Sequence, residues 1–545
     1  MPGAEVVAVF PNRIKIAVSD ISDLKGQEPV EVGSYLRVYD GNESSIIAVI
    51  ENYSIEIRGS ETEDEERKKV YMIEAVPLGY IGADGKFKRG GGGITIPPKD
   101  VVVASHLEIQ SIYDALGSDI RRFHFAQLSQ DPAVKVPVDG DKFFNRHIAI
   151  VGSTGSGKSH AMARIIQSAT EIRDPSRDSY SLNNSHIVIF DIHSEYLSAF
   201  PEANYLNVES LSLPYWLLNS EELQSLFIET VEEQSQNQIA ILKRGITENR
   251  KEHFSGPDER RDIIHYDSPL YFDLGGVIDF IRAKNEEMIP GATGKLVNGS
   301  LKGKFENFLT RLENKYTDRR LDFLLGDQTR NMTLEGVLRQ FIGYDEDRKS
   351  NVTIIDLSGV PFEVLSISVS LISRLLFDYA YYYKKAHAEG KSETPLLVVY
   401  EEAHKYVPKS ELSKYSASRS AIERIAKEGR KYGITAAIVS QRPAEISETI
   451  FSQCSNFLAM RLTNPEDQRY VRRLIPDSLG PLTDSLPMLQ SGEALLLGDA
   501  AVMPSIIKLK QANPAPSSND ICYMQEWIRP WHDVLFEPLL KDWQK

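Results

Sequence analysis

The chain has 545 residues, which is too many for one hydrophobic core, so we expect two to four domains. Hydrophobic residues make up 41% and charged residues 26%, as in an ordinary globular protein. The formal net charge of −15 argues against a protein that coats nucleic acid with its whole surface, although a locally basic channel inside an acidic shell is compatible with it.

The two cysteines, Cys454 and Cys522, are not spaced as a CxxC pair, which argues against a zinc site and against a disulfide framework. The sequence contains no apolar run approaching the ~18–20 residues that span a bilayer. The N-terminal residues also lack the basic and long apolar regions of a signal peptide. We therefore expect a cytoplasmic protein without membrane contact.

Residues 1–115 alternate short β-branched runs with turn signals. The runs read EVVAVF, RIKIAV, YLRVYD, SIIAVIENYSIEI and VYMIEAVPLGYI, and a charged stretch and a glycine-rich stretch interrupt them. Strands of this length and spacing predict a small antiparallel β-barrel at the N-terminus.

From about residue 145 the pattern changes to alternating strands and helices. Strand-like runs occur at residues 147–151, 186–192, 351–357, 396–402, 434–440, 456–462 and 493–499. The early runs are continuously apolar, as expected of strands that crossover helices bury on both faces. We predict an α/β fold with a doubly wound, mostly parallel sheet, formed by residues 116–204 and 349–512.

Residues 205–348 contain few strand-like runs and much charged, helix-like sequence. We interpret them as a helical insertion in the sheet-forming domain, and an independently folded domain remains an alternative. Residues 513–545 form a C-terminal tail that begins with a Pro/Ser linker. Its Trp527, Trp531 and Trp543 need a surface that covers their indole rings.

The stretch GSTGSGKS at residues 152–159 satisfies the pattern G-x-x-x-x-G-K-[ST], with an apolar strand before it and an amphipathic helix after it. Glycine lets the backbone N–H groups of such a P-loop approach phosphates, and the helix aims the positive end of its dipole at the same anion. We expect Lys158 to reach the β- and γ-phosphates of ATP and the Ser159 hydroxyl to bind Mg²⁺. The predicted ATP-binding residues are Gly152, Ser153, Thr154, Gly155, Ser156, Gly157, Lys158, Ser159 and His160.

Acidic residues follow two of the apolar runs. Glu401 and Glu402 end the run at 396–402, and Asp191 ends the run at 186–192. A P-loop needs a carboxylate from a neighbouring strand end to hold Mg²⁺ and polarise water. We expect Glu401 to assist the metal, Glu402 to activate water and Asp191 to contact metal or water from further out, whereas solvated acids at a strand end are the alternative.

The next candidates lie around the run at 434–440. Gln441 follows this strand, where a polar side chain can sense the γ-phosphate. Arg430 or Arg424, on the polar side of the preceding helix, could act across a subunit boundary as an arginine finger. Ordinary surface arginines are an equally good interpretation of each one taken singly.

The ordered motifs GSTGSGKS, FDIHSEY, VVYEEAHKYVP, RIAKEGRKYGI, SQRP and RLTNPEDQ resemble the HerA branch of the HerA/FtsK ATPases over nearly the whole chain. The resemblance implies a RecA-like P-loop core, an N-terminal HAS-like barrel and a homo-hexameric ring that moves double-stranded DNA through its pore with ATP and Mg²⁺. It also implies a partner effector: a NurA-type nuclease in DNA repair, or another nuclease or a Sir2-like NAD-cleaving protein in antiviral defence. The sequence leaves the choice among these partners open.

Carried over by position, Lys158 and Ser159 match the family's nucleotide loop, and Glu402 matches its water-activating acid. By the same match, Asp191 corresponds to the acid of the D-x-H-x-E-Y segment, Arg430 to the arginine-finger region with Arg424 as a rival, and Arg146 to an additional arginine near the nucleotide. The family often has Asp-Glu where this chain has Glu401-Glu402. Because glutamate is one methylene longer than aspartate, the position of the metal could differ, although the charge is the same.

The loop at 404–420 carries Lys405, Lys409, Lys414 and Arg419, and six copies around a ring would give the pore a basic, DNA-contacting lining. A solvated surface loop is the alternative. An ATPase ring that chiefly scaffolds and regulates a partner enzyme stays open as a rival to a translocase. A P-loop protein that acts on a small molecule or protein is a second rival, which the ordered motifs disfavour.

Overall fold

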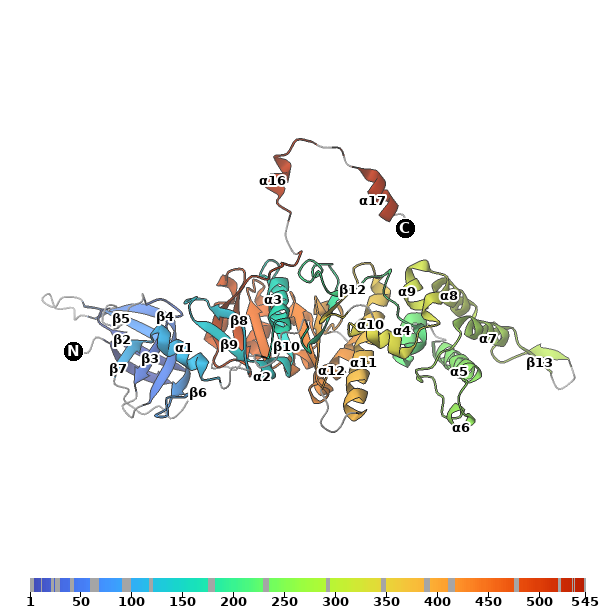
Figure 1. The fold of residues 1–545 in the computed structure, drawn as a ribbon, viewed down its shortest axis with the longest axis horizontal. Helices are drawn as coiled ribbons and strands as arrows, with labels where there is room; N and C mark the ends of the chain where they lie inside the picture. The colour runs from blue at the N-terminus through green and yellow to red at the C-terminus, as the bar shows by residue number, and fades with distance from the viewer. Residues whose placement is uncertain are drawn as a thin grey trace.

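The molecule is elongated, with a small sheet at the N-terminal end, a large sheet in the middle and a group of helices at the other end (Figure 1). The structure is a computed structural model. It describes residues 4–10, 12–20, 24, 30–39, 44–58, 68–90, 100–116, 121–174, 182–228, 235–290, 295–344, 349–386, 393–409, 417–474, 480–517 and 521–543 apart from 532 and 534.

The N-terminal sheet is antiparallel, with the strand order β1-β2-β5-β4-β3-β7 and with β6 paired to β5. Its strands are β1 Ala4–Phe10, β2 Arg13–Val18, β3 Tyr35–Tyr39, β4 Ser45–Arg58, β5 Lys68–Ile81, β6 Phe87–Arg89 and β7 Asp100–Val103. Alternate residues such as Ile14, Ile16 and Val18 point into its core. The sheet is curled, and β1 and β7 approach each other but share no ladder within the described residues, so the predicted barrel is confirmed only in its coarser form.

The central sheet has 11 strands in the order β12-β15-β11-β16-β17-β10-β18-β19-β20-β8-β9. They are β8 Arg122–Leu128, β9 Lys135–Asp139, β10 Ile148–Val151, β11 His186–Asp191, β12 Asn204–Leu206, β15 Val352–Asp356, β16 Leu396–Tyr400, β17 Ile434–Ser440, β18 Asn456–Met460, β19 Glu493–Gly498 and β20 Ser505–Leu509. The strands from β12 to β18 are parallel, and β19, β20, β8 and β9 are added antiparallel. Each of the seven predicted runs coincides with a strand of this sheet.

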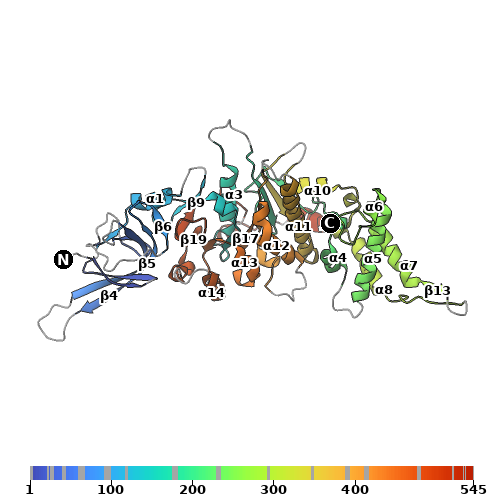
Figure 2. The same ribbon diagram turned by 90° about the horizontal axis from the view of Figure 1, so that it is seen from below.

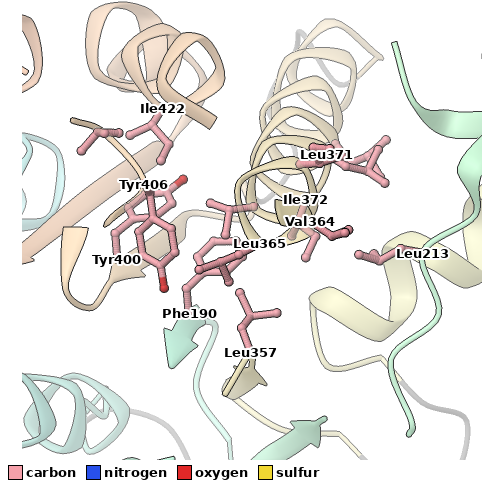
Figure 3. Close-up of a cluster of buried hydrophobic side chains, with 14 of the residues drawn as sticks. Phe190, Leu213, Leu357, Val364, Leu365, Leu371, Ile372, Tyr400, Tyr406 and Ile422 are labelled. Atoms are coloured by element: carbon pink, nitrogen blue, oxygen red, sulfur yellow. The ribbon is translucent and has the colours of Figure 1, made fainter. Parts of the chain in front are cut away.

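Helices cover both faces of the central sheet, as the double winding predicts. Ile148 and Ile150 of β10 pack into one hydrophobic cluster together with α3 Lys158–Thr170. The alternate residues Ala149 and Val151 pack into a second cluster, which contains α11 Phe362–Ala386 and α12 Ala417–Glu428. Figure 3 shows Leu365 and Ile372 of α11 in that cluster, near Phe190 of β11 and Tyr400 of β16.

The segment between β12 and β15 is mainly helical. It contains α4 Ser220–Phe227, α5 Ser235–His253, α6 Asp258–Arg261, α7 Leu274–Glu286, α8 Glu306–Tyr316, α9 Asp322–Leu325, α10 Leu334–Phe341 and the hairpin β13 Met288–Pro290 with β14 Leu296–Asn298. The hairpin projects at the far end of the molecule (Figure 2). All of these helices except α6 contribute to the cluster of α11, and an ion pair 2.8 Å long between the buried Glu222 of α4 and the partly buried Arg374 of α11 joins the two segments. The boundaries at residues 115, 204, 348 and 512 stay predictions.

The remaining helices are α1 His106–Asp114, α2 Gly140–Phe144, α13 Glu448–Gln453, α14 Pro465–Leu474, α15 Gly480–Thr483, α16 Tyr523–Trp527 and α17 Phe536–Trp543. Helices α16 and α17 lie away from the rest of the chain (Figure 1). Within the described residues, only α11 is long and apolar enough to match the length and composition of a bilayer span. Most of its apolar window is buried inside the protein, as in a core helix.

Candidate nucleotide-binding site

The P-loop connects β10 to α3 through residues 152–157. A Cβ atom at Gly152 would lie 2.6 Å from Ser156 Oγ and 2.9 Å from Met460 Cβ, so this position has no room for a side chain. Gly157, which precedes α3, has a φ of 98°, in the left-handed region that favours glycine. No described side chain caps α3, so its first backbone N–H groups stay available to an anion at the positive end of the helix dipole.

Lys158 is buried at the start of α3, and its Nζ lies 3.3 Å from the Ser153 carbonyl oxygen, to which it donates. Burial lowers the pKa of the Lys158 ammonium, while the carboxylates of Glu402, Glu401 and Glu195 act in the opposite direction. The following residues, Ser159 and His160, are partly buried on the first turn of α3. The loop therefore presents one ammonium group in an acidic surrounding.

Glu401 follows β16 and is only 2% exposed. Its Oε2 accepts a hydrogen bond from the Tyr196 hydroxyl at 2.7 Å. Burial raises the pKa of Glu401 to about 8, the Tyr196 hydrogen bond opposes the rise, and the nearby Glu402 charge adds to it. Glu401 is thus a buried carboxyl group that a nearby positive charge would ionise.

Glu402 is also buried, and its backbone lies in the left-handed region, at φ 50° and ψ 46°. A non-glycine residue held there costs of order 1 kcal/mol and occurs chiefly where the surroundings fix it. The Gln441 amide donates to Oε1 of Glu402, and His404 Nδ1 lies 3.2 Å from Oε2. The Gln441 hydrogen bond thus holds Oε1 of Glu402 at the carboxyl edge of the sheet, whereas Oε2 is buried without a hydrogen-bond partner.

Gln441 connects the P-loop to Glu402. Its Oε1 accepts a hydrogen bond from Thr154 Oγ1 at 2.5 Å, while its Nε2 contacts Glu402. These three residues follow β10, β17 and β16, which are adjacent parallel strands, so their carboxyl ends lie at the same edge. A change in the conformation of the P-loop can therefore move the Glu402 carboxylate through the Gln441 side chain.

Asp191 is fully buried, and both of its oxygens bind the backbone of its own loop. Oδ1 accepts from the His193 N–H at 3.1 Å and Oδ2 from the Tyr196 N–H at 2.9 Å. Burial raises the pKa of Asp191 in spite of these hydrogen bonds. Asp191 thus holds the loop that places the Tyr196 hydroxyl on Glu401, and it acts on the site through that loop.

The sequence interpretation gave no role to Tyr196 or to Asp356. Asp356 ends β15, and its Oδ2 accepts a hydrogen bond from Ser194 Oγ at 2.6 Å, so it supports the same loop. Ser194 has a φ of 55°, so this loop also contains a strained position. The available signals were the tyrosine of FDIHSEY and an acid that ends another apolar run.

The structure does not bring the predicted arginines to the P-loop of their own chain. Arg146 precedes β10, whose four residues span about 13 Å, and it pairs with Asp499 at the opposite edge of the sheet. Arg430 is exposed, just before β17, at that same edge. Arg424 lies over the Phe377 ring at 4.2 Å and 3.4 Å from Asp378.

Two of the four predicted DNA contacts are paired with carboxylates. Lys409 lies 2.9 Å from Glu448, and Arg419 lies 2.8 Å from Glu423, which reduces the positive charge that either one offers to a phosphate. Lys405 is partly buried in the short turn after Glu402. Lys414 lies outside the described residues.

Comparisons with known proteins show what the part of the chain around the P-loop is similar to. The family model described as "Helicase HerA, central domain" matches residues 123–376. This part of the chain is therefore similar to the central domain of HerA helicases. The HerA match begins in β8 and ends within α11, so it includes the P-loop and Asp191 and stops before Glu401.

Curated relatives carry the same HerA name. The chain is 26% identical over 486 residues to the DNA double-strand break repair helicase HerA of Sulfolobus acidocaldarius, covering 88% of this chain and 86% of that one. It is 27% identical over 471 residues to the HerA of Sulfurisphaera tokodaii, covering 85% and 83%. The predictions of a HerA-type protein and of an ATP-hydrolysing enzyme are confirmed.

Among solved structures, VirB4 of Thermoanaerobacter pseudethanolicus is similar, with 14% identity, a TM-score of 0.49 and coverage of 72% of this chain and 98% of that chain.

Proposed function

We propose that the chain is an ATP-dependent motor that moves double-stranded DNA and works as a homo-hexameric ring. The observation that carries this proposal is the match to the HerA central domain of a chain whose P-loop, Gln441 and Glu402 are joined by hydrogen bonds at one sheet edge. The relatives are named DNA double-strand break repair helicases, which supports duplex DNA as the substrate.

In the proposed reaction, Lys158 and the N–H groups at the start of α3 bind the β- and γ-phosphates of ATP. Ser159 and Glu401 would hold Mg²⁺, since they offer a hydroxyl group and a buried carboxyl group, and within the described residues no group of three or more His, Cys, Asp or Glu forms a separate metal cage. Bound Mg²⁺ supplies charge neutralisation of the phosphates. Glu402 accepts a proton from the attacking water, and Gln441 connects that carboxylate to the loop.

Ring assembly would complete the site. Arg430 and Arg146 lie at the edge of the sheet opposite to their own P-loop, and Arg424 contacts Phe377 and Asp378. A phosphate contact by any of them would therefore use the P-loop of another copy. Arg430 has no ion pair among the described residues, whereas Arg424 contacts Phe377 and Asp378, which favours Arg430 as the finger. Lys405, Lys409, Lys414 and Arg419 remain candidates for the pore.

The ring would work in the cytoplasm, without a membrane, and with an effector that uses the moving DNA. Candidates are a NurA-type nuclease in DNA repair, and another nuclease or a Sir2-like NAD-cleaving protein in antiviral defence. The N-terminal sheet is the proposed docking region for neighbours or partner, since loops and strand edges favour pairing.

The decisive measurement is ATP hydrolysis by purified chain with and without blunt duplex DNA, together with the molar mass in the presence of ATP. We expect a mass near six copies and a several-fold stimulation by duplex DNA. Displacement of a third strand from a triplex would report movement along the duplex. A monomer that hydrolyses ATP at a rate unaffected by DNA would contradict the proposal.

The second candidate is an ATPase ring that chiefly scaffolds and regulates a partner enzyme. One observation favours this candidate: the large apolar side chains of the C-terminal segment 521–543 are exposed. Such side chains could bind another polypeptide. On this candidate, the partner would stimulate ATP hydrolysis and duplex DNA would not.

A further inference from the structure

The P-loop edge has more negative than positive groups in the described chain. Glu401, Glu402 and Glu195 all act on Lys158, and the three predicted arginines lie elsewhere. A nucleotide phosphate chain adds further negative charge to this edge. A second cation from the same chain would stabilise that charge, and two arginines follow strands beside β10: Arg442 after β17 and Arg461 after β18.

Arg442 is engaged by another residue. Its side chain is exposed, and Nη1 lies 2.7 Å from Glu445 Oε1 in an i,i+3 ion pair. Arg461 has no ion pair with any described carboxylate, and its Nε is buried without a hydrogen-bond partner. A buried N–H group without a hydrogen-bond partner is unfavourable, so an anion that accepts from it would be stabilised at this position.

Arg461 is also tied to the P-loop. Its carbonyl oxygen accepts the Ser153 N–H at 2.8 Å, and the Thr463 N–H donates to Ser153 Oγ at 3.1 Å. Arg461 Nη2 would lie 3.9 Å from a Cβ atom built on Gly155, and among the described residues no other atom, apart from those of Gly155 and its two chain neighbours, comes within 4 Å of that point. The guanidinium group thus lies beside the open tip of the loop.

The strand order indicates which part of a nucleotide would meet Arg461. The acids and Gln441 follow β16 and β17, on one side of β10, and Arg461 follows β18 on the other side. The γ-phosphate has to face the water-activating acid, so the rest of the phosphate chain extends toward β18. A planar guanidinium group suits two phosphate oxygens at once.

We propose that Arg461 is a nucleotide-binding residue that contacts the α- and β-phosphates shared by ADP and ATP. The inference rests on the proposed function in so far as the P-loop binds a nucleotide. An arginine finger acts on the departing γ-phosphate, whereas Arg461 would bind ADP and ATP equally. Its loss would therefore raise the KM for ATP and change kcat little.

The test is calorimetric titration of the full chain with ADP and Mg²⁺, without DNA, for wild type, Arg461→Met, Arg461→Lys and the control Arg442→Met. Loss of a charge-assisted hydrogen bond predicts about 10- to 100-fold weaker ADP binding in Arg461→Met. We expect an intermediate loss in Arg461→Lys and wild-type affinity in Arg442→Met. Thermal unfolding without nucleotide checks that each variant is folded.

Wild-type ADP affinity in folded Arg461→Met would overturn the inference, and so would a variant that loses affinity for ATP alone. If Arg461→Met does not fold, Arg461→Lys decides, because unchanged affinity in that variant would contradict a role for the guanidinium group. Absence of ADP binding by the wild type would overturn both proposals. Normal ADP binding without any response to duplex DNA would contradict only the translocase function.

Discussion

The carboxyl edge of the central sheet and the C-terminal segment 521–543 depart from the usual distribution of side chains in opposite directions. At the sheet edge, Lys158, Glu401 and Glu402 are buried although they are ionisable. In the C-terminal segment, Trp527 and Trp531 are 74% and 94% exposed although they are aromatic. Buried charges and exposed apolar patches are the two departures that point to an interaction.

The two regions differ in how far other side chains of the same chain stabilise the unusual residues. At the sheet edge, hydrogen bonds from Tyr196 and Gln441 hold both glutamates in place before any nucleotide binds. In the C-terminal segment, the described hydrogen bonds stay within the segment, and its indole rings are largely exposed, with only the Tyr523 ring packed against Trp527. The first region is therefore preorganised by the chain, and the second depends on something outside it.

The largest effect is expected for Lys158→Ala, which removes the ammonium group that the acidic edge surrounds. ATP hydrolysis should fall by about 1,000-fold or more in kcat/KM, because the phosphates lose their one buried cation from the loop. A phosphate-release assay measures it, with Lys142→Ala, an exposed lysine of α2, as the control. Hydrolysis within threefold of wild type would show that the buried lysine is structural.

Glu402→Gln tests whether the strained acid does chemistry. We expect kcat to fall by about 100- to 10,000-fold, since the amide cannot accept a proton from water. ATP binding should persist, because the phosphate-binding groups are unchanged, so equilibrium binding and turnover should separate. Glu445→Gln, an exposed acid paired with Arg442, is the matched control and should leave turnover unchanged. Normal turnover by Glu402→Gln would refute its assignment as the water-activating acid.

Tyr196→Phe should have a smaller effect, which depends on pH. The hydroxyl group donates to Glu401 and lowers a pKa that burial raises to about 8, so its removal should raise that pKa further. If metal binding needs ionised Glu401, kcat/KM should rise with pH through the Glu401 pKa, and this limb should move to higher pH in the variant. Tyr400→Phe is the control, because Tyr400 is equally buried but its hydroxyl contacts Ser373. An unchanged pH profile in Tyr196→Phe would show that the hydrogen bond does not tune Glu401.

The raised pKa of Glu401 also makes the stability of the fold depend on pH. Because the folded-state pKa of Glu401 lies above its ordinary value of 4.5, the folded protein binds this proton more tightly than the unfolded chain. The free energy of unfolding should therefore fall as pH rises from about 4.5 to about 8 in the absence of nucleotide. Glu401→Gln should flatten this dependence, as chemical denaturation at several pH values would show. A slope in Glu401→Gln equal to that of wild type would assign the dependence to other groups.

The parts of the fold that the sequence predicts are those with a local signal. β10, β11 and β16 are continuous apolar runs buried on both faces, and the P-loop is one contiguous motif. β20 alternates buried and partly buried residues, and β9 contains Pro137, so neither has the signal of a central strand. Both lie in the antiparallel part of the sheet.

Within the candidate site, the individual residue types could be predicted but their pairings could not. Tyr196 and Glu401 are separated by 205 positions in the sequence, and their hydrogen bond depends on how Asp191 folds the intervening loop. Arg146 lies only a few residues before the P-loop, yet the extended strand β10 places it at the other edge of the sheet. Separation along the sequence therefore does not predict proximity to the site: the fold of a loop decides it for Tyr196, and the direction of a strand decides it for Arg146.

The smallest effect is expected for deletion of residues 521–545. The unfolding temperature of the isolated chain and its affinity for ADP should change little, since the described hydrogen bonds of this segment stay within it and the anchoring residues 513–517 are kept. Among these, the Ser517 N–H donates to the Glu195 carbonyl oxygen at 2.8 Å. Of the four tryptophans, Trp216 is buried at 6% exposure, so the deletion should shift the fluorescence maximum to shorter wavelength. If the full-length assembly already emits at short wavelength and the deletion lowers its unfolding temperature, another chain covers the indole rings. The indole rings would then be exposed only in the isolated chain, and in the assembly they would be buried.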